Sequence, residues 1–218
     1  MRSKKLTWPI MLGVCAWLVL PAVPARAGVL LSTLLHPGAT ISSGGLTFSH
    51  FAYSKTGSMP SPSTVTVNPI LLSGNYGLQF VGAFTTPKGS TADALITYKV
   101  TVTSGAPVSS ALLTGNPKVT GGTGDMFVVD SFTPTNPASM FIYSISPGPT
   151  VDSASVNFGK GLTSFSAQKD IEAISRTGVA SVGFLDQTYH TIPEPHSAIL
   201  AGLGMAGLAG FVWRRKLA

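Results

Sequence analysis

The sequence predicts an all-β protein, an antiparallel β-sandwich of a jelly-roll-like or immunoglobulin-like kind. Three observations lead to this fold class. Between residues 28 and 192, apolar and polar residues alternate in many short segments, turn-forming residues separate those segments, and no stretch of ten or more residues has the period of a helix. Without helices to cover a parallel sheet, such strands favour two packed antiparallel sheets. An N-terminal signal peptide and a C-terminal transmembrane helix are expected to flank this sandwich.

Residues 1–27 have the composition of a signal peptide. An apolar run over residues 6–20 follows three cations, Arg2, Lys4 and Lys5. Ala25 and Ala27 place small side chains at the two positions that signal peptidase reads, so cleavage is expected after Ala27. An uncleaved anchor is the alternative, but the run is short and flanked by prolines. Lipidation of Cys15 is a second alternative, which fits poorly with Val14 directly before it.

The first strand is expected over residues 45–53, where the apolar positions change parity. Leu46 and Phe48 are followed by Phe51 and Tyr53. One extra residue in the strand restores the phase, so a β-bulge is predicted near Ser49-His50.

Two further strands alternate more regularly. Residues 76–84 place Leu78, Phe80 and Phe84 on one face, with Gly82 where a bulge or a close backbone approach is expected. In residues 92–103 the apolar positions are Ala94, Ile96, Tyr98, Val100 and Val102. This period of two predicts a half-buried strand.

Seven more strands complete the sandwich. They are expected over residues 65–70, 108–113, 126–132, 140–145, 154–158, 168–174 and 180–191. Turns are predicted at Asn68-Pro69, Asn116-Pro117 and Asn136-Pro137, a loop at residues 121–124, and a strand end at residues 146–149. One domain, residues 28–192, is therefore expected between the two terminal segments.

The C-terminal segment, residues 193–218, has the composition of a membrane span with a basic tail. Residues 197–213 are uncharged and just long enough to cross the hydrocarbon layer as a helix. Three cations follow in the tail 214–218, namely Arg214, Arg215 and Lys216. By the positive-inside rule, the tail lies in the cytoplasm and residues 28–192 lie on the other side of the membrane.

The net charge of +6 comes from these two terminal segments. Between residues 28 and 192, seven cations balance seven acidic residues, and the cations are scattered singly. Binding through phosphate contacts requires clustered cations, so no nucleic-acid partner is expected. The single cysteine, Cys15, lies in the signal peptide, so the exported domain has no internal disulfide.

No motif for catalysis or metal binding is found. No serine lies within Gly-x-Ser-x-Gly, and His36, His50 and His190 lie far apart in sequence. Asp125 and Asp130 are too distant along one strand for paired glycosidase chemistry, so they are interpreted as turn caps or weak cation ligands. Asp170 and Glu172, near Lys169 and Arg176, are interpreted as an ordinary solvated cluster. We expect no enzyme, no cofactor and no metal.

Pro193-Glu194-Pro195, the apolar span and the basic tail together resemble the PEP-CTERM sorting signal of Gram-negative bacteria. The resemblance implies export through the inner membrane, recognition by exosortase, cleavage near the motif, and release or re-anchoring at the envelope, cell surface or extracellular matrix. The body also resembles exported PEP-CTERM proteins, through residues 45–53, 77–80, 93–100 and 180–192. This second resemblance implies a fold but no activity.

We therefore expect a non-catalytic structural or adhesive component associated with exopolysaccharide and biofilm. The alternative is a carbohydrate-binding module in which Tyr53, Tyr76 or Tyr143 stacks on a sugar ring. A third possibility is a polysaccharide-modifying hydrolase that uses Asp125, Asp130 or Asp186. Aromatic rings or carboxylates that converge on one surface would discriminate between these functions.

Overall fold

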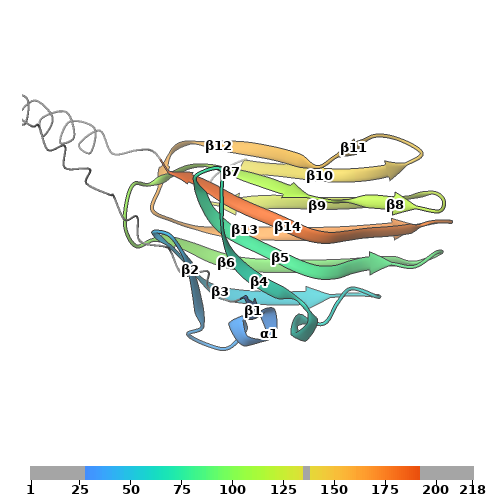
Figure 1. Ribbon diagram of the computed structural model, residues 1–218, viewed down its shortest axis with the longest axis horizontal. Helices are drawn as coiled ribbons and strands as arrows, with labels where there is room; N and C mark the ends of the chain where they lie inside the picture. Colours follow the sequence, from blue (N-terminus) through green and yellow to red (C-terminus); the bar gives the residue numbers. More distant parts are fainter. Residues whose placement is uncertain (1–27, 135–137, 192–218) are drawn as a thin grey trace, which may run out of the picture.

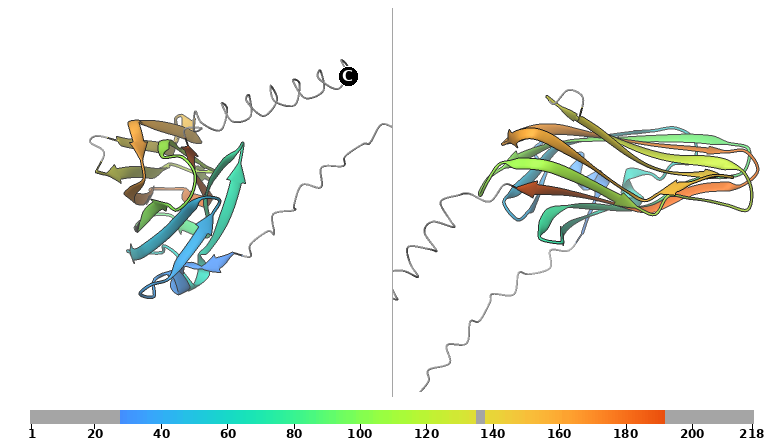
Figure 2. Two further views of the ribbon diagram at one scale, coloured as in Figure 1. Left: turned by 90° about the vertical axis from the view of Figure 1, so that its left-hand side faces the viewer. Right: turned by 90° about the horizontal axis from the view of Figure 1, so that it is seen from above.

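The computed structural model describes residues 28–134 and 138–191, which form two seven-stranded antiparallel sheets packed face to face (Figures 1 and 2). The first sheet has the order β1 (Val29–Leu30), β4 (Thr66–Leu72), β5 (Asn75–Thr86), β14 (Val179–Thr191), β7 (Val108–Gly115) and β12 (Ser153–Leu162), with β8 (Lys118–Thr120) beside β14. The second has the order β11 (Thr150–Val151), β10 (Ala138–Ser146), β9 (Gly124–Thr133), β13 (Ser164–Ser175), β6 (Thr91–Val102), β3 (Leu46–Lys55) and β2 (Thr40–Ser43). The predicted antiparallel β-sandwich is confirmed.

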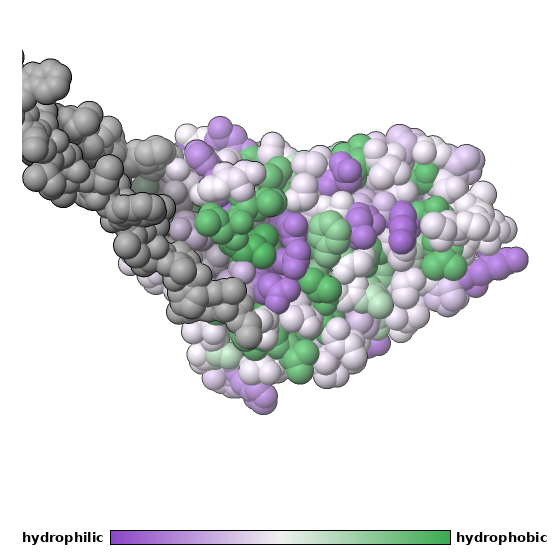
Figure 3. All heavy atoms as spheres, viewed as in Figure 1, coloured by the Kyte–Doolittle hydropathy of each residue, from purple (hydrophilic) through white to green (hydrophobic). Residues whose placement is uncertain are grey.

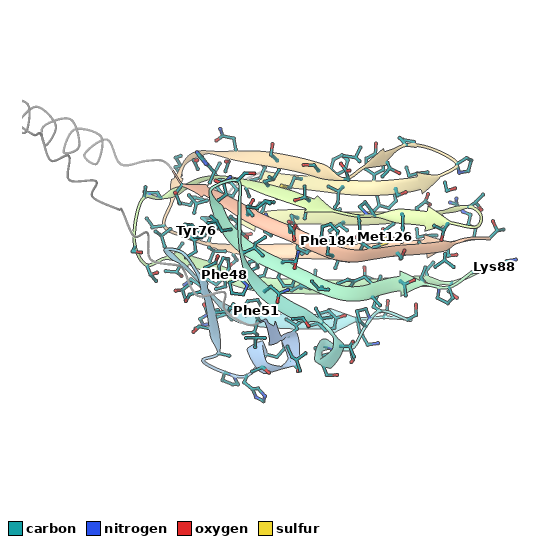
Figure 4. All side chains as sticks on the ribbon, in the orientation of Figure 1. Phe48, Phe51, Tyr76, Lys88, Met126 and Phe184 are labelled. Carbon is teal, nitrogen blue, oxygen red and sulfur yellow. The ribbon has the colours of Figure 1, made fainter. Side chains whose placement is uncertain are left out.

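The core lies between the sheets because each strand alternates inward apolar and outward polar residues. On β6, Ala94, Ile96, Tyr98 and Val100 are buried, as the alternation predicts. The ring of Tyr98 contacts the rings of Phe48, Phe51 and Phe80, with centroids 5.4 to 6.0 Å apart. Figure 4 labels Phe48 and Phe51, together with Met126 further along the sandwich.

Both bulges suggested by the sequence are present. The register of β3 against β6 shifts between Ser49 and Ala52, and His50 has a φ of 54°. In the first sheet, Gly82 and Ala83 of β5 lie opposite the single residue Gly183 of β14. Asn116 Oδ1 accepts hydrogen bonds from the backbone N–H groups of Gly183 and Phe184, which satisfies donors at this irregularity.

The turn prediction at Asn68-Pro69 is wrong, because both residues lie inside β4. Strand β1 pairs with β4 only at Thr66 and Val67, so beyond Val67 one edge of β4 has no strand partner among the described residues. Proline is tolerated in a strand at such an edge, where its missing N–H breaks no ladder bond. The predicted turn at Asn116-Pro117 separates β7 from β8, and Asn136-Pro137 lies outside the described residues.

Several short elements were not predicted, including β1, β2, β8 and β11, the helix α1 (Leu31–Leu34) and the 3₁₀ turn η1 (Pro62–Thr64). These elements are shorter than the window in which a periodicity can be recognised. Within residues 28–134 and 138–191, no helix has the length and hydropathy that a membrane crossing requires. The span predicted over residues 197–213 lies outside this part of the chain.

One broad side of the sandwich, shown in Figure 3, is mostly pale, the colour of residues of intermediate hydropathy, with small green and purple areas between them. Tyr76 lies at the end of the sandwich where β14 finishes, since it pairs with Tyr189. Lys88 lies at the tip of the opposite end (Figure 4). The last described residue, Thr191, therefore leaves the sandwich at the Tyr76 end.

Candidate functional site

The three aspartates considered for catalysis lie in three different environments. Asp130 of β9 points into the core, whereas Asp125 of the same strand lies on the outer face of the second sheet. Asp186 of β14 lies on the outer face of the first sheet, beside Gln79 and Thr114 on the neighbouring strands. The fold does not bring these carboxylates together on one surface.

The interpretation of Asp130 as a turn cap or weak cation ligand is wrong. Its carboxylate is 2% exposed and accepts two hydrogen bonds from Lys169 Nζ on β13, both 2.7 Å long. Lys169 is 1% exposed, so its placement in a solvated cluster is also wrong. Both residues occupy inward positions of their strands, in rows that are otherwise apolar except for Ser175 at the end of β13.

The third proton of Lys169 Nζ is donated to Gln187 Oε1 of β14 across the core, at 3.1 Å. Gln187 Nε2 in turn donates to the backbone oxygen of Leu112, at 3.3 Å. An ammonium has three donors, so all the donors of Lys169 are used. Burial raises the pKa of Asp130 and lowers the pKa of Lys169, because the protein interior solvates neither charge well, while the attraction between the two groups opposes both shifts.

Of the three tyrosines considered for sugar binding, only Tyr143 lies on an outer sheet face. Tyr53 points inward on β3 and donates a hydrogen bond to the backbone oxygen of Pro60, at 2.7 Å. Burial, together with the charge of Asp93, raises the pKa of Tyr53 to about 12. Tyr76 lies at the end of the sandwich, over Gly44. These two tyrosines therefore do not share a surface with Tyr143.

Tyr143 is the centre of a row of three aromatic rings on the outer face of β9 and β10, here called the aromatic strip, which consists of Phe127, Phe141 and Tyr143. The ring of Tyr143 lies 5.9 Å from that of Phe127 on β9, its direct partner across the ladder. It also lies 5.9 Å from the ring of Phe141, at an interplanar angle of 27°. Phe141 is 56% exposed and Val129 beside it is 39% exposed. The strip is thus an open apolar surface.

Acidic side chains border the aromatic strip on the next strand. Asp170 of β13 lies opposite Val129, and Glu172 lies opposite Phe127, while Asp93 of β6 lies opposite Glu172. Burial, a hydrogen bond to Asp93 and the charges of Asp93 and Glu172 raise the pKa of Asp170 to about 6. The predicted neighbour Arg176 instead forms a 3.4 Å ion pair with Asp125. Asp170 and Glu172 are thus neighbours of a third acid, not of paired cations.

Sequence reasoning missed Phe127 and Phe141. The outward positions of both strands carry apolar as well as polar residues, so no strict alternation marks the outward rings in the sequence. One pattern in the sequence does predict the outward rings. The two consecutive strands predicted over residues 126–132 and 140–145 both carry aromatic residues at positions that alternate with their buried residues. Joining them as a hairpin brings those aromatics onto one face.

The described residues contain no group of three or more His, Cys, Asp or Glu side chains that could hold a metal ion. His50 Nδ1 lies 2.9 Å from Ser49 Oγ, and His190 Nδ1 lies 3.0 Å from Asn75 Oδ1. Each of these two histidines thus has a local hydrogen-bond partner.

Comparison with solved structures gives low similarity. TmCBM61 in complex with β-1,4-galactotriose has a TM-score of 0.34 and 10% identity, covering 63% of this chain and 88% of that chain. The enzymatically active domain of tailspike protein 4 of bacteriophage CBA120 has a TM-score of 0.30 and 16% identity, covering 64% of this chain but 19% of that one. A structure reported for the promiscuous specificity of carbohydrate-binding modules of the β-sandwich superfamily has a TM-score of 0.25 and 13% identity, covering 67% and 58%. Scores this low carry no argument about the ligand or activity of this chain, and no curated protein matches it.

The two terminal segments are interpreted from their sequence, because they lie outside the residues that the structure describes. Ala25, Ala27, Pro193, Glu194 and Pro195, and the cations Arg214, Arg215 and Lys216, lie outside the described residues. The family model of the PEP-CTERM protein-sorting motif matches residues 191–216, which confirms the resemblance of this segment. The chain therefore carries a PEP-CTERM sorting motif, which implies an exported, cell-envelope-associated protein that exosortase processes.

Proposed function

We propose that the sandwich is a non-catalytic polysaccharide-binding domain and that the aromatic strip is its binding surface. In this function the protein is a structural or adhesive component of the cell surface or extracellular matrix of a Gram-negative bacterium. The single observation that carries the proposal is the row of three outward rings on β9 and β10, each 5.9 Å from its neighbour.

The chemistry of the strip suits a sugar chain. The C–H face of a pyranose is apolar and flat enough to stack on an aromatic ring, and such a contact removes apolar surface from water on both sides. Adjacent carboxylates of Asp170 and Glu172 can accept hydrogen bonds from sugar hydroxyls. Exposed aromatics next to polar side chains therefore combine affinity with orientation, as small-molecule sites usually do.

A glycan array probed with the purified protein, followed by affinity electrophoresis in the best polysaccharide, tests the proposal. We expect Phe141→Ala and Tyr143→Ala each to weaken binding by at least about tenfold, which corresponds to about 1.4 kcal/mol. Leu71→Ala is the matched control, because Leu71 is 59% exposed on β4, in the other sheet. It is expected to bind as the wild type does.

Two outcomes contradict this function. The wild-type protein could bind no polysaccharide, which would favour a purely structural component. Alternatively, both aromatic variants could bind as strongly as the wild type, which would place the binding surface elsewhere on the sandwich.

We also propose that Pro193-Glu194-Pro195 is the sequence that exosortase reads, that Arg214, Arg215 and Lys216 fix the topology of the span, and that signal peptidase cleaves after Ala27. Proline holds φ near one value and biases the residue before it away from helix, so we expect this segment to be accessible to a protease. In a host with exosortase, the wild type is expected to lose its C-terminal segment, whereas Glu194→Ala accumulates in the longer form. Mass spectrometry that finds Trp213 and Arg214 still present on the wild type in that host would refute this processing.

A further inference from the structure

The pair Lys169 and Asp130 is unusual because an amine and a carboxyl group are held in direct contact inside the sandwich. Their Cα atoms are direct partners across the β13–β9 ladder. Lys169 Nζ lies 2.7 Å from Asp130 Oδ1 and 2.7 Å from Oδ2, so the nitrogen is held against the carboxyl group, at equal distance from its two oxygens. Both side chains are almost completely buried.

Along β9 and β13, the inward neighbours on either side of the pair are apolar. On β9, Val128 and Phe132 flank Asp130 on the inward face, and on β13 Ala167 and Ile171 flank Lys169. All four flanking residues are buried. Water is therefore excluded from the pair, and each charge pays a desolvation penalty.

Burial shifts both groups toward their uncharged forms, since it raises the pKa of Asp130 and lowers that of Lys169. The uncharged forms are a carboxylic acid and a free amine. These are the two species that react to form an amide, because only the free amine has a lone pair and only the protonated carboxyl has a leaving group.

We propose that Lys169 and Asp130 condense into an intramolecular isopeptide bond that joins β13 to β9. The Nζ lone pair attacks Asp130 Cγ and forms the N–C bond. The Cγ–OH bond of the tetrahedral intermediate then breaks, and a proton from the nitrogen goes to the departing hydroxyl, so that the products are an amide and one water molecule. No oxidant, reductant or co-reactant is required.

The structure favours this reaction in three ways. Reacting groups held in contact by a rigid fold need not lose translational and rotational freedom, which is the largest advantage that intramolecular reactions have. Gln187 Oε1, 3.1 Å from Nζ, can accept one of the two N–H groups of the free amine and so orients the nitrogen. The product also replaces two buried charges by one neutral amide, which removes the cost of desolvating an ion pair.

Such a bond would be a covalent cross-link within the exported domain. Residues 28–192 contain no cysteine, so a disulfide within them is not available. The bond would link β9 and β13, which are neighbouring central strands of the second sheet. This inference is independent of polysaccharide binding.

The test is tryptic digestion of the denatured full chain followed by mass spectrometry. Without the bond, trypsin releases residues 119–160, 161–169 and 170–176 as separate peptides. With the bond, trypsin cannot cleave after the acylated Lys169, so residues 161–176 remain joined to residues 119–160. The mass of this product is lower by one water than the sum of the peptides 119–160 and 161–176. Recovery of residues 161–169 as a free peptide in full yield overturns the proposal.

Two lysine variants sharpen the result. Lys169→Arg keeps a cation and a tryptic site but cannot form this amide, so its peptides are expected to be separate. Lys160→Arg is the matched control, because Lys160 is exposed at the end of β12, and it should keep the bond. A bond that persists in Lys169→Arg, or a bond from Lys169 to Gln187 with loss of ammonia, would show that the assignment to this pair is wrong. The wild-type digest decides the question even where Lys169→Arg fails to fold.

Discussion

Strands β9 and β13 differ in chemistry between their two faces. On the inner face, Asp130 and Lys169 form an ion pair away from water. On the outer face of the same strands, the half-buried ring of Phe127 lies beside Glu172 and borders the exposed Phe141 and Val129. The inner face, where apolar residues are expected, thus contains a pair of charged side chains. The outer face, where polar residues are expected, carries aromatic rings.

This contrast shows which features packing alone does not explain. A buried ion pair is seldom more stabilising than an apolar pair of the same size, and an exposed aromatic strip does not strengthen the core. We therefore propose a chemical role for each feature: a covalent bond for the buried pair and polysaccharide binding for the aromatic strip. Substitutions on the inner face should reduce the free energy of unfolding more than substitutions on the outer face.

The largest loss is expected for Lys169→Met. Methionine fills the volume of the lysine stem, so no cavity forms, but Asp130 is left buried without its cation. Breaking a buried pair in this way destabilises a protein by about 3–5 kcal/mol. The midpoint of urea unfolding, measured by circular dichroism, reports the loss.

The double variant Lys169→Met with Asp130→Leu is the control for this prediction. Replacing both partners by apolar residues removes the unpaired charge, so the double variant should be more stable than Lys169→Met alone. A single Lys169→Met variant as stable as the wild type would contradict the buried pair that the distances describe.

Phe165→Ala is expected to cost about 3–5 kcal/mol of unfolding free energy, because it leaves a cavity in the core. Phe165 is 3% exposed on the inner face of β13, and its ring contacts those of Phe132, Phe158 and Tyr189. Phe141→Ala, the same substitution on the outer face, is expected to change stability by no more than about 0.5 kcal/mol. Equal losses in the two variants would mean that Phe141 belongs to the core.

Tyr98→Phe should have a smaller effect than either buried substitution above. The hydroxyl of Tyr98 forms a 2.9 Å hydrogen bond with that of Tyr189, and both groups are buried. Removing one hydroxyl leaves the other without this partner, at an expected cost of about 1 kcal/mol. The double variant with Tyr189→Phe should lose less than the sum of the two single variants, and strict additivity in thermal unfolding would argue against the bond.

Much of the inner face could be predicted from the sequence. The alternation in β6 and β5 located Tyr98 and Phe80 correctly, and the parity change in β3 located the bulge at His50. Lys169 stands in the inward row with Phe165, Ala167 and Ile171, so the same parity argument also applied to it. The general rule that charged residues are exposed predicts the wrong environment for Lys169, because the local pattern places this residue in the core.

The outer face was harder to predict because it depends on which strands are neighbours. Asp170 meets Asp93 only because β13 pairs with β6, although the two residues are far apart in the chain. No local pattern encodes that pairing. The contact between Lys169 and Gln187 was inaccessible for a similar reason, since it crosses from one sheet to the other.

The smallest effect is expected for Asp170→Asn on the outer face, and it depends on pH. The pKa of Asp170 is raised to about 6 in the folded protein, against about 3.9 for an aspartate in an unfolded chain. The folded state therefore binds this proton more tightly, so the contribution to stability is fully present below about pH 4 and is lost as the pH rises through about 6. The asparagine variant keeps a donor to Asp93 but has no carboxyl to ionise, so its stability should fall less than that of the wild type over this range. At pH 7 we expect the asparagine variant to be more stable than the wild type by only a few tenths of a kcal/mol, because solvent screens this partly exposed cluster.

Glu172→Gln is the matched control. It removes one of the repelling charges but keeps Asp170, so the loss of stability that accompanies ionisation of Asp170 should move to lower pH. Parallel curves of unfolding free energy against pH for the wild type and Asp170→Asn would show that the acidic neighbours do not perturb Asp170.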